Sequence, residues 1–392
     1  MADVGVYHNS ILSGGGAETV AVTAIEGLVD DGHNVSLYTT DDATARTLAE
    51  YYAIDIDPES LEVINPSQRL NSIVDAAVEV ITRATDVQDL LLLRNALMEI
   101  PVRYKYVDNH DVFLSTQGEF FHDGVIHYIH FPYYSADAMR AYTNRFDDPI
   151  YSSYHWFCRL VKKLFRAWWS QSGRVLTNSR WTSKVIQEVY ETKAGVVYPP
   201  VPVEQFDPPA WSEKEAGFVT IGRIHPTKRQ KKLIGIMDAI VERGHDTHLH
   251  IVGDGGDGSY YDRVQQLAAE RNYIHLEGRV SRAKLVSLIE NHRFGIHGKH
   301  HEHFGIVVAE MLAGGIVPLV PRGGGQTEVV DGREQLVYDD EAGAVEKATS
   351  LFENNINQQK LFEPNPAQRF RKERFANRIV EVVSDANTQP RS

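Results

Sequence analysis

The densest group of chemically versatile residues is the segment His301-Glu-His-Phe-Gly-Ile-Val-Val-Ala-Glu310, in which seven residues separate the carboxylates of Glu302 and Glu310. If Gly305-Ile-Val307 opens a helix, its amides can hold a phosphate, because backbone donors at a helix N-terminus point at anions. Carboxylates accept hydrogen bonds from hydroxyl groups, so Glu310 suits ribose and Glu302 suits a sugar. An acid that only complements the helix dipole would explain Glu302, but not Glu310 in its apolar stretch.

A second candidate site combines two cations after a predicted strand. In Ile221-Gly-Arg-Ile-His-Pro-Thr-Lys228, Arg223 ends the strand and we expect Lys228 in the first turn of the next helix. Acidic residues normally occupy such a turn, so a basic group there indicates an anionic ligand shared between the helix dipole and the cations. A solvated basic surface would explain the neighbouring Arg229 and Lys232 equally well. Arg223 and Lys228 are therefore the stronger candidates for an anion-binding site.

A glycine-rich loop, Gly14-Gly-Gly16, precedes a predicted helix near the N-terminus. Glycine lacks Cβ, so Gly15 and Gly16 could let an anion approach the backbone donors of that helix. The loop does not match the glycine motif that binds nicotinamide dinucleotides, because Thr19 stands where a third glycine is needed. A tight turn alone is the alternative.

Two groups could hold a metal ion. Asp55-Ile-Asp57 has an Asp-x-Asp form that can hold a divalent cation, but it precedes Pro58 in an ordinary connection, where a solvated loop is expected. The second group consists of His292, His297, His300, His301 and His303. Imidazole is the commonest metal ligand, yet this spacing matches no zinc pattern. We expect no metal and no cofactor.

The segment from Phe157 to Gln187 carries seven basic residues and no acidic one. A helix over about 156–169 would be amphipathic, with apolar and basic residues on opposite faces. The apolar face contains Phe157, Leu160, Val161, Leu164, Phe165 and Trp168, and the basic face contains Arg159, Lys162, Lys163 and Arg166, with Trp169 next in the chain. This is typical of a helix lying on an anionic bilayer surface. Packing of the apolar face on the core is the alternative.

The elements that must position these residues are strands alternating with helices. Val4-Gly-Val-Tyr7, a helix over 17–31 and Val35-Ser-Leu-Tyr38 form a βαβ unit. Further strands are expected at 111–116, 125–130, 175–178 and 195–198, with helical stretches around 41–52 and 70–99. Prolines between Pro199 and Pro209 cannot lie inside a sheet and mark a domain boundary.

Apolar runs separated by helix-length segments predict a second parallel sheet beyond this boundary. They lie at 218–222, 248–252, 274–277, 294–297, 316–320 and 335–338. We therefore predict an N-terminal domain over 1–200, a second domain over 201–362, and a helix over 363–392 that returns to the first domain.

Composition excludes several classes of protein. The 392 residues carry 40 Lys and Arg against 53 Asp and Glu, a net charge of −13, which disfavours binding to nucleic acid. One cysteine, Cys158, cannot form an internal disulfide. No leader and no apolar run of about 18 residues is evident. We expect a cytoplasmic protein, peripheral on the cytoplasmic face of a membrane.

The order of the motifs resembles that of the retaining glycosyltransferases of family 4. These motifs are Gly14-Gly-Gly-Ala-Glu18, Gly222-Arg-x4-Lys228, Val252-Gly-Asp-Gly255, Glu277-Gly-Arg-Val280, Glu302-x7-Glu310 and Gly323-Gly-Gly-Gln-Thr-Glu328. His301-Glu-His-Phe-Gly305, Tyr128-Ile-His-Phe-Pro-Tyr133, Thr177-Asn-Ser-Arg-Trp-Thr182 and Val197-Tyr-Pro-Pro-Val201 resemble more narrowly the eukaryotic α-1,2-mannosyltransferases that extend the dolichol-linked oligosaccharide. The resemblance implies an α/β GT-B fold, with two doubly wound Rossmann-like domains facing a central cleft. The domain over 1–200 would then be the acceptor-side domain, and the domain over 201–362 would bind the nucleotide-sugar donor.

The resemblance also implies roles for individual residues. Arg223 and Lys228 would hold the donor diphosphate, and backbone around Arg279 would meet the base. The implied catalytic residues are His130, beside the donor sugar and the incoming hydroxyl, with Glu302, Arg223 and Lys228. The implied donor-binding residues are Gly15, Gly16, Gly222, Arg223, Lys228, Arg279, Val280, Glu302, Phe304, Gly305, Ile306, Val307 and Glu310.

The leading function is transfer of a hexose, with mannose as the candidate, from a GDP- or UDP-linked donor to a hydroxyl of a glycan or lipid-linked saccharide, with retention at the anomeric carbon. Cations and helix amides would stabilise the departing diphosphate, so no metal is required. One alternative is a GT-B nucleotide-sugar epimerase, which needs no acceptor site or membrane helix. A non-catalytic nucleotide-sugar-binding protein is disfavoured by the presence of both Glu302 and Glu310.

Overall fold

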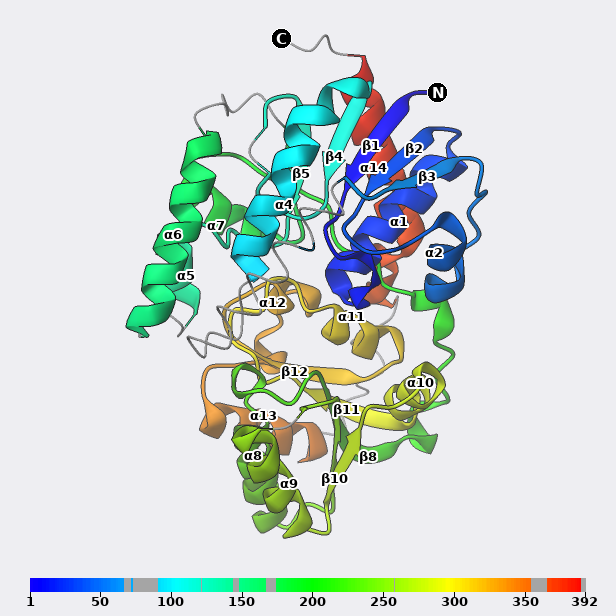
Figure 1. Cartoon of the computed structure of the whole chain (residues 1–392). Coiled ribbons are helices and arrows are strands. Elements are labelled where there is room, and N and C mark those ends of the chain that lie inside the picture. Colours follow the sequence, from blue (N-terminus) through cyan, green and yellow to red (C-terminus); the bar gives the residue numbers. More distant parts are fainter. Residues whose placement is uncertain are drawn as a thin grey trace. The chain divides into compact units, whose positions relative to one another are not determined.

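The computed structural model divides the chain into two compact units, Met1–Pro200 with Glu373–Ser392, and Val201–Lys372 (Figure 1). It describes residues 1–66, 72, 91–120, 122–143, 148–166, 174–256, 258–353 and 365–388, without the side chains of 91 and 162–166. The expected return of the chain from 363 begins instead at Glu373. The reason is that Phe370 is buried in the second unit, with its ring 5.2 Å from that of Phe304.

The first unit contains a seven-stranded parallel sheet in the order β3-β2-β1-β4-β5-β6-β7. Its strands are β1 (Asp3–Tyr7), β2 (Asn34–Tyr38), β3 (Leu61–Ile64), β4 (Val112–Ser115), β5 (Val125–Ile129), β6 (Val175–Thr177) and β7 (Gly195–Val196). Every residue of β4 and β5 is buried, as expected for parallel strands covered on both faces.

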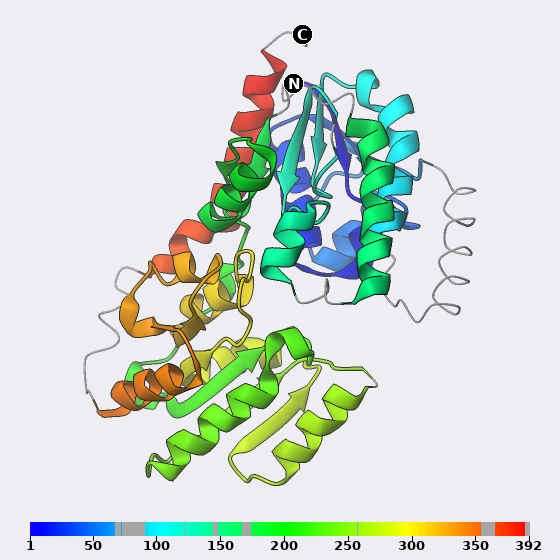
Figure 2. The same cartoon turned by 90° about the vertical axis from the view of Figure 1, so that its left-hand side faces the viewer.

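The helices of the first unit are α1 (Gly16–Asp30), α2 (Ala45–Tyr52), α4 (Leu91–Lys105), α5 (Ala136–Tyr142), α6 (Pro149–Arg166), α7 (Arg180–Tyr190) and α14 (Lys372–Asn387). Part of the predicted helical stretch over 70–99 lies outside the described residues. Helix α14, red in Figure 2, buries Phe375, Ile379 and Val383 in the same core as α1. Gly27 of α1 permits this contact, because a Cβ there would lie 2.7 Å from Ala376 Cβ.

The second unit contains a six-stranded parallel sheet in the order β10-β9-β8-β11-β12-β13. Its strands are β8 (Glu215–Ile221), β9 (Leu249–Val252), β10 (Ile274–Gly278), β11 (His292–Ile296), β12 (Val317–Pro321) and β13 (Val337–Tyr338). Its helices are α8 (Gln230–Glu242), α9 (Ser259–Ala269), α10 (Arg282–Asn291), α11 (Ile306–Ala313), α12 (Gln326–Val329) and α13 (Glu341–Glu353). Six strands were predicted in this half, and all six are present.

In each sheet the chain first adds strands in one direction from the first strand and then continues on its other side. The reversal falls between β1 and β4 in the first unit and between β8 and β11 in the second. Ligands of open α/β sheets bind at the carboxyl ends of the strands at such a point. No helix in the described part of the chain has the length and apolar composition needed to cross a membrane.

Candidate functional site

The loops that follow β8 and β11 meet at the point where the second sheet reverses its strand order. Lys228 belongs to the first loop and Glu302 to the second. Lys228 Nζ donates a hydrogen bond to Glu302 Oε2 over 2.7 Å. The ion pair therefore marks the place where a ligand of this fold is expected.

A second cation binds the other oxygen of the same carboxylate. Lys299 Nζ donates to Glu302 Oε1 over 2.8 Å, and the Glu302 side chain is only 15% exposed. Burial alone would raise the pKa of Glu302, but the charge of Lys228 above all, with that of Lys299, holds the pKa well below its usual range. His297 Nε2 lies 3.4 Å from Glu302 Oε2, and burial lowers the pKa of this imidazole. Two lysines and one ionised carboxylate leave the group with a net positive charge.

Glycines allow the loops around Lys228 to approach one another. The lysine side chain passes over Gly222, where a Cβ would lie 3.4 Å from Lys228 Cε. Gly253 has φ 148°, and a Cβ there would lie 2.1 Å from the carbonyl oxygen of Gly222. A Cβ on Gly298 would lie 2.4 Å from the carbonyl oxygen of Lys228. A side chain at 253 or 298 would therefore push these loops apart.

The glycine triplet after β12 fixes the backbone of Glu302. Gly325 N donates to Glu302 O over 2.7 Å, and His301 N donates to Gly323 O over 3.0 Å. A Cβ on Gly324 would lie 2.8 Å from Glu302 N. Gly323-Gly-Gly325 thus positions the Glu302 carboxylate by fixing the backbone that carries it.

Helix α11 begins where the sequence predicted. Gly305 is its N-cap residue, with φ 101° and no side chain to cap the first amides. Ile306 and Val307 form the first turn, and Glu310 follows inside the helix. Phe304 is buried with its ring against Phe370, so its side chain supports the start of the helix.

Glu310 has a partner that the sequence did not identify. Arg282, at the start of α10, donates from Nη1 to Glu310 Oε1 over 2.6 Å. Glu310 is 7% exposed, and burial raises its pKa against the opposing charge of Arg282. The only sequence signal for this pair was the position of Arg282 beside Arg279 and Val280, the segment expected to meet the base.

The environment of Lys228 corrects one expectation. The residue lies in a short 3-10 turn, Pro226–Lys228, and not in the first turn of α8, which begins at Gln230. Arg229 stands between them with φ 57°, a left-handed conformation that ends the turn. Arg223 and Arg279 are exposed. With the residues that the structure describes, the Arg223 guanidinium forms no ion pair.

The basic residues Lys231 and Lys232 of α8 fit an ordinary solvated surface. Lys232 forms an ion pair with Glu341. Lys231 places its ammonium 5.4 Å from the centre of the Tyr260 ring. These two cations therefore have partners on the surface of the unit itself.

The glycine loop of the first unit is capped by the chain's own carboxylate. Glu18 Oε2 accepts from Gly15 N over 2.8 Å, and Oε1 accepts from Ser13 Oγ over 2.7 Å. Burial alone would raise the pKa of Glu18, but contacts with His8 and Ser13 lower it to about 2. The Gly15 amide, a donor-binding candidate, is thus already bonded, whereas Gly16 opens α1.

His130 follows β5 directly. Its Nε2 lies 3.1 Å from Thr116 O, and because a carbonyl only accepts, the proton sits on Nε2. His8 Nδ1 lies 3.0 Å from Thr116 Oγ1. Burial, followed by the nearby His8, lowers the pKa of His130 to about 4. The imidazole is therefore neutral at pH 7.

The structure gives Asp57 a role in a turn and separates the five histidines that were considered as metal ligands. Asp57 accepts from Glu59 N and Ser60 Oγ, each over 3.1 Å, and so caps a turn on an exposed loop with Asp55. His292 begins β11, whereas His297 lies beyond its other end. The five histidines therefore do not come together.

Helix α6 (Pro149–Arg166) starts about seven residues earlier than expected. Cys158 packs against Ala96 and Tyr134, whereas Trp156, Phe157 and Leu160 are 62%, 46% and 40% exposed.

Part of the predicted apolar face thus points away from the core, together with Trp156, which the prediction omitted. Arg159 is exposed as expected. The side chains of Lys162, Lys163 and Arg166, and the whole of Trp168 and Trp169, lie outside the described residues.

Residues 203–369 match the family model of glycosyl transferases group 1. The GDP-Man:Man(3)GlcNAc(2)-PP-Dol alpha-1,2-mannosyltransferase of Dictyostelium discoideum is 23% identical, covering 97% of this chain and 84% of the relative. The enzyme of the same name from Neurospora crassa is 26% identical over 58% of this chain and 48% of its own length.

Two solved structures have a similar fold. WaaG, a glycosyltransferase involved in lipopolysaccharide biosynthesis, has a TM-score of 0.68 at 13% identity, covering 97% of this chain and 99% of its own. Anabaena HepE, solved in complex with UDP and glucose, has a TM-score of 0.64 at 16% identity, covering 98% and 100%.

Proposed function

We propose that this chain, a hexosyltransferase with a group 1 glycosyltransferase domain and the GT-B fold, moves a hexose from a nucleotide diphosphate sugar to a hydroxyl of a glycan or lipid-linked saccharide, with retention. The observation that carries the proposal is the ion pair of Lys228 with Glu302 at the strand-order reversal of the second sheet. It supports the proposal because two lysines and the carboxylate that we assign to the sugar lie at the same strand ends.

The positive group suits the departing diphosphate. In transfer, the bond between the anomeric carbon and the diphosphate oxygen breaks, and negative charge grows on that oxygen. Lys228 and Lys299, with the uncapped amides that open α11, lie in the part of the fold where this charge is expected. Fixed donors of this kind stabilise a transition state more than a ground state. The exposed Arg223 at the end of β8 is the third cation that we assign to the diphosphate.

The two carboxylates have different roles in this proposal. Glu302 is ionised and can accept hydrogen bonds from hydroxyls of the transferred sugar. Glu310 is held by Arg282 and accepts from the ribose with its remaining lone pairs. Backbone at Arg279 and Val280, just before α10, is assigned to the base. His130, a neutral imidazole, is the candidate on the acceptor side.

The relatives suggest the donor to test first. They are named for GDP-mannose and a dolichol-linked acceptor, whereas one structural neighbour was solved with UDP and glucose. GDP-mannose and a lipid-linked acceptor are therefore our first choice, and UDP-glucose is the second. The exposed residues Trp156, Phe157 and Leu160 of α6 support peripheral binding to the membrane that would contain such an acceptor.

The test is a donor screen with lipid-extracted acceptors, with each donor also incubated alone. Transfer with retained anomeric configuration, read by NMR of the product, supports the proposal. Epimerised sugar from donor alone would instead show an epimerase. Tight donor binding without any reaction would show a binding protein. Lys231→Ala is the matched control for Lys228→Ala, because the Lys231 ammonium contacts Tyr260 and not Glu302.

A further inference from the structure

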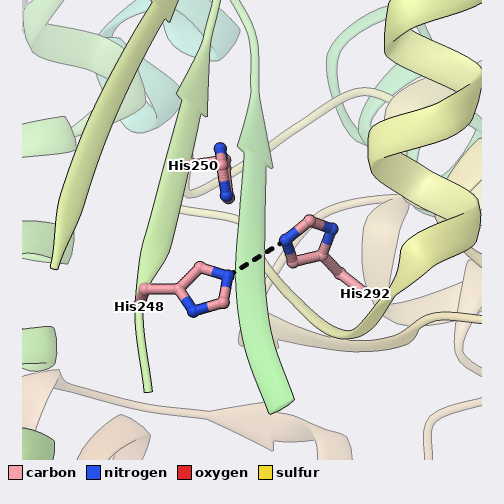
Figure 3. A group of neighbouring side chains, drawn as sticks. All are labelled: His248, His250 and His292. Atoms are coloured by element: carbon pink, nitrogen blue, oxygen red, sulfur yellow. Dashed lines mark hydrogen bonds between the residues drawn. The ribbon is translucent and has the colours of Figure 1, made fainter. Parts of the chain in front are cut away.

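Three histidine rings, two from the start of β9 and one from the start of β11, converge near the amino ends of these strands (Figure 3). One ring nitrogen from each of His248, His250 and His292 lies within 4.8 Å of the other two. His248 Nε2 and His292 Nε2 are 3.1 Å apart. Two nitrogens bound to one tetrahedral zinc ion, at about 2.0–2.1 Å each, would be about 3.3 Å apart. This pair therefore already has the spacing of two ligands.

The sheet topology creates the group. His250 belongs to β9 and His248 directly precedes it, and the two share a face because alternate residues of an extended chain do so. Strand β8 lies between β9 and β11. Its Val219 pairs with His250 and its Phe218 with Leu249, so Gly217 stands opposite His248. A Cβ on Gly217 would lie 2.3 Å from His248 Nε2. The missing side chain thus opens the space through which His248 reaches His292.

The far nitrogens of two rings are fixed by other groups. His292 Nδ1 donates to Leu288 O over 2.7 Å, which leaves the lone pair of Nε2 directed at His248. His250 Nδ1 lies 2.7 Å from Glu277 Oε1. Metal-bound histidines commonly donate their second nitrogen to a carbonyl or carboxylate in this way, which fixes the tautomer and the ring orientation.

A carboxylate lies beside the same nitrogens. Glu215 Oε2 is 3.5 Å from His248 Nε2 and 4.0 Å from His292 Nε2. Glu215 begins β8, and its side chain is largely exposed, so it can rotate by the small amount that coordination requires. Three imidazoles and one carboxylate are a tetrahedral ligand set of the kind that zinc accepts.

We propose that His248, His250 and His292, with Glu215 as the fourth ligand, form a structural site for a divalent transition metal, zinc being the best match. Two neutral imidazoles have one proton between their facing Nε2 atoms. On binding, this proton would move to Nδ1 of His248, so that both Nε2 lone pairs face the metal. The site ties β9 to β11 across β8 at their amino ends, whereas Lys228 and Glu302 follow the carboxyl ends of β8 and β11. The metal would therefore stabilise the second unit without entering the transfer reaction.

The test uses the full chain without a histidine tag, stripped of metal by a chelator and returned to chelator-free buffer. Zinc is titrated in competition with a coloured indicator, and bound metal is counted by elemental analysis. We expect one tightly bound zinc per chain and a higher thermal unfolding midpoint in its presence, because a ligand that binds only the folded state stabilises it. Cobalt in place of zinc should give the visible spectrum of a four-coordinate ion.

Variants assign the ligands. His248→Gln with His250→Gln should abolish both the tight binding and the rise in midpoint. Glu277→Gln should weaken zinc binding by about 10- to 100-fold, the usual cost of losing a partner of a metal-bound histidine. The control is His245→Gln, since this histidine of the same unit stacks on Phe352 and lies outside the group.

Two outcomes would overturn the proposal. One is wild-type protein without stoichiometric zinc binding. The other is a double variant that binds zinc as tightly as the wild type. If a histidine variant fails to fold, the exposed Glu215→Gln replaces it, and unchanged zinc affinity and cobalt spectrum in that variant would exclude Glu215 and the four-ligand site.

Discussion

Lys228 and Glu302, 74 residues apart in the sequence, share a 2.7 Å hydrogen bond, and we assign the two residues to different tasks. In our proposal the lysine binds an anion and the carboxylate binds hydroxyl groups, and the charge of Lys228 helps to keep Glu302 ionised. In a variant without Lys228, Glu302 would keep its ion pair with Lys299. Loss of Lys228 should therefore impair ligand chemistry more than folding.

We accordingly expect Lys228→Ala and Arg223→Ala each to lower kcat/KM for transfer by about 10- to 1000-fold, the range for loss of one electrostatic contact to a developing charge. Steady-state kinetics with purified protein of wild-type circular dichroism measures this effect. Lys231→Ala should leave the rate within about twofold of wild type. Unchanged turnover in folded Arg223→Ala would remove that residue from the diphosphate site.

Stability at low pH should depend on Glu302. Its pKa lies well below 4.5 in the folded protein, because Lys228, His297 and Lys299 together outweigh the effect of burial. The folded state then binds its proton less readily than the unfolded state, so the resulting stability is present above about pH 4.5 and is lost as pH falls through the folded pKa.

Glu302→Gln removes this titration. The difference in the free energy of unfolding between wild type and Glu302→Gln should be constant at neutral pH and shrink on acidification below about pH 4.5. Urea unfolding at a series of pH values measures it. A difference that stays the same down to pH 3 would contradict the depressed pKa.

Most of the fold could be predicted because it depends on local patterns. Apolar runs and the prolines after Pro199 are visible in the sequence, and Gly305 marks the start of α11. The position of Lys228 outside α8 was missed, since it depends on the left-handed backbone of Arg229. Local periodicity does not reveal such a turn.

The partners within the sites depend on sheet order and register, which the sequence does not display. Arg282 meets Glu310 because α10 and α11 both lie against the second sheet, although the two residues are 28 positions apart. His248 and His292 meet only because β8 lies between their strands and carries Gly217 at that position. Neither pair could be chosen from spacing alone.

Transfer should not require an added divalent cation. Lysine ammonium groups and helix amides neutralise the diphosphate in the proposed site, and the histidine group lies at the other ends of the strands. With a chelator present, we expect a lower thermal midpoint but unchanged kcat at temperatures well below unfolding. Complete loss of turnover at such a temperature, restored by manganese, would place a metal in the reaction.

Membrane binding should depend on both faces of α6. Each Lys or Arg close to an anionic surface contributes about 1 kcal/mol, so Arg159, Lys162, Lys163 and Arg166 should make binding measurable and sensitive to salt. Exposed Trp156 and Phe157 would enter the headgroup region. Sedimentation with vesicles that contain phosphatidylserine, compared with neutral vesicles, measures the effect at low and high salt.

Charge reversal tests whether vesicle binding depends on the basic residues of this helix or on the net charge of the protein. Lys162, Lys163 and Arg166 changed to Glu should release the protein from anionic vesicles and spare transfer to a short water-soluble acceptor, because the proposed diphosphate site belongs to the second unit. The matched control changes three exposed residues elsewhere in the first unit, Arg46, Lys105 and Lys193, to Glu, with the same change in charge. Equal release of both variants would indicate a general charge effect. Wild-type protein that fails to sediment with anionic vesicles at low salt would leave α6 with a packing role only.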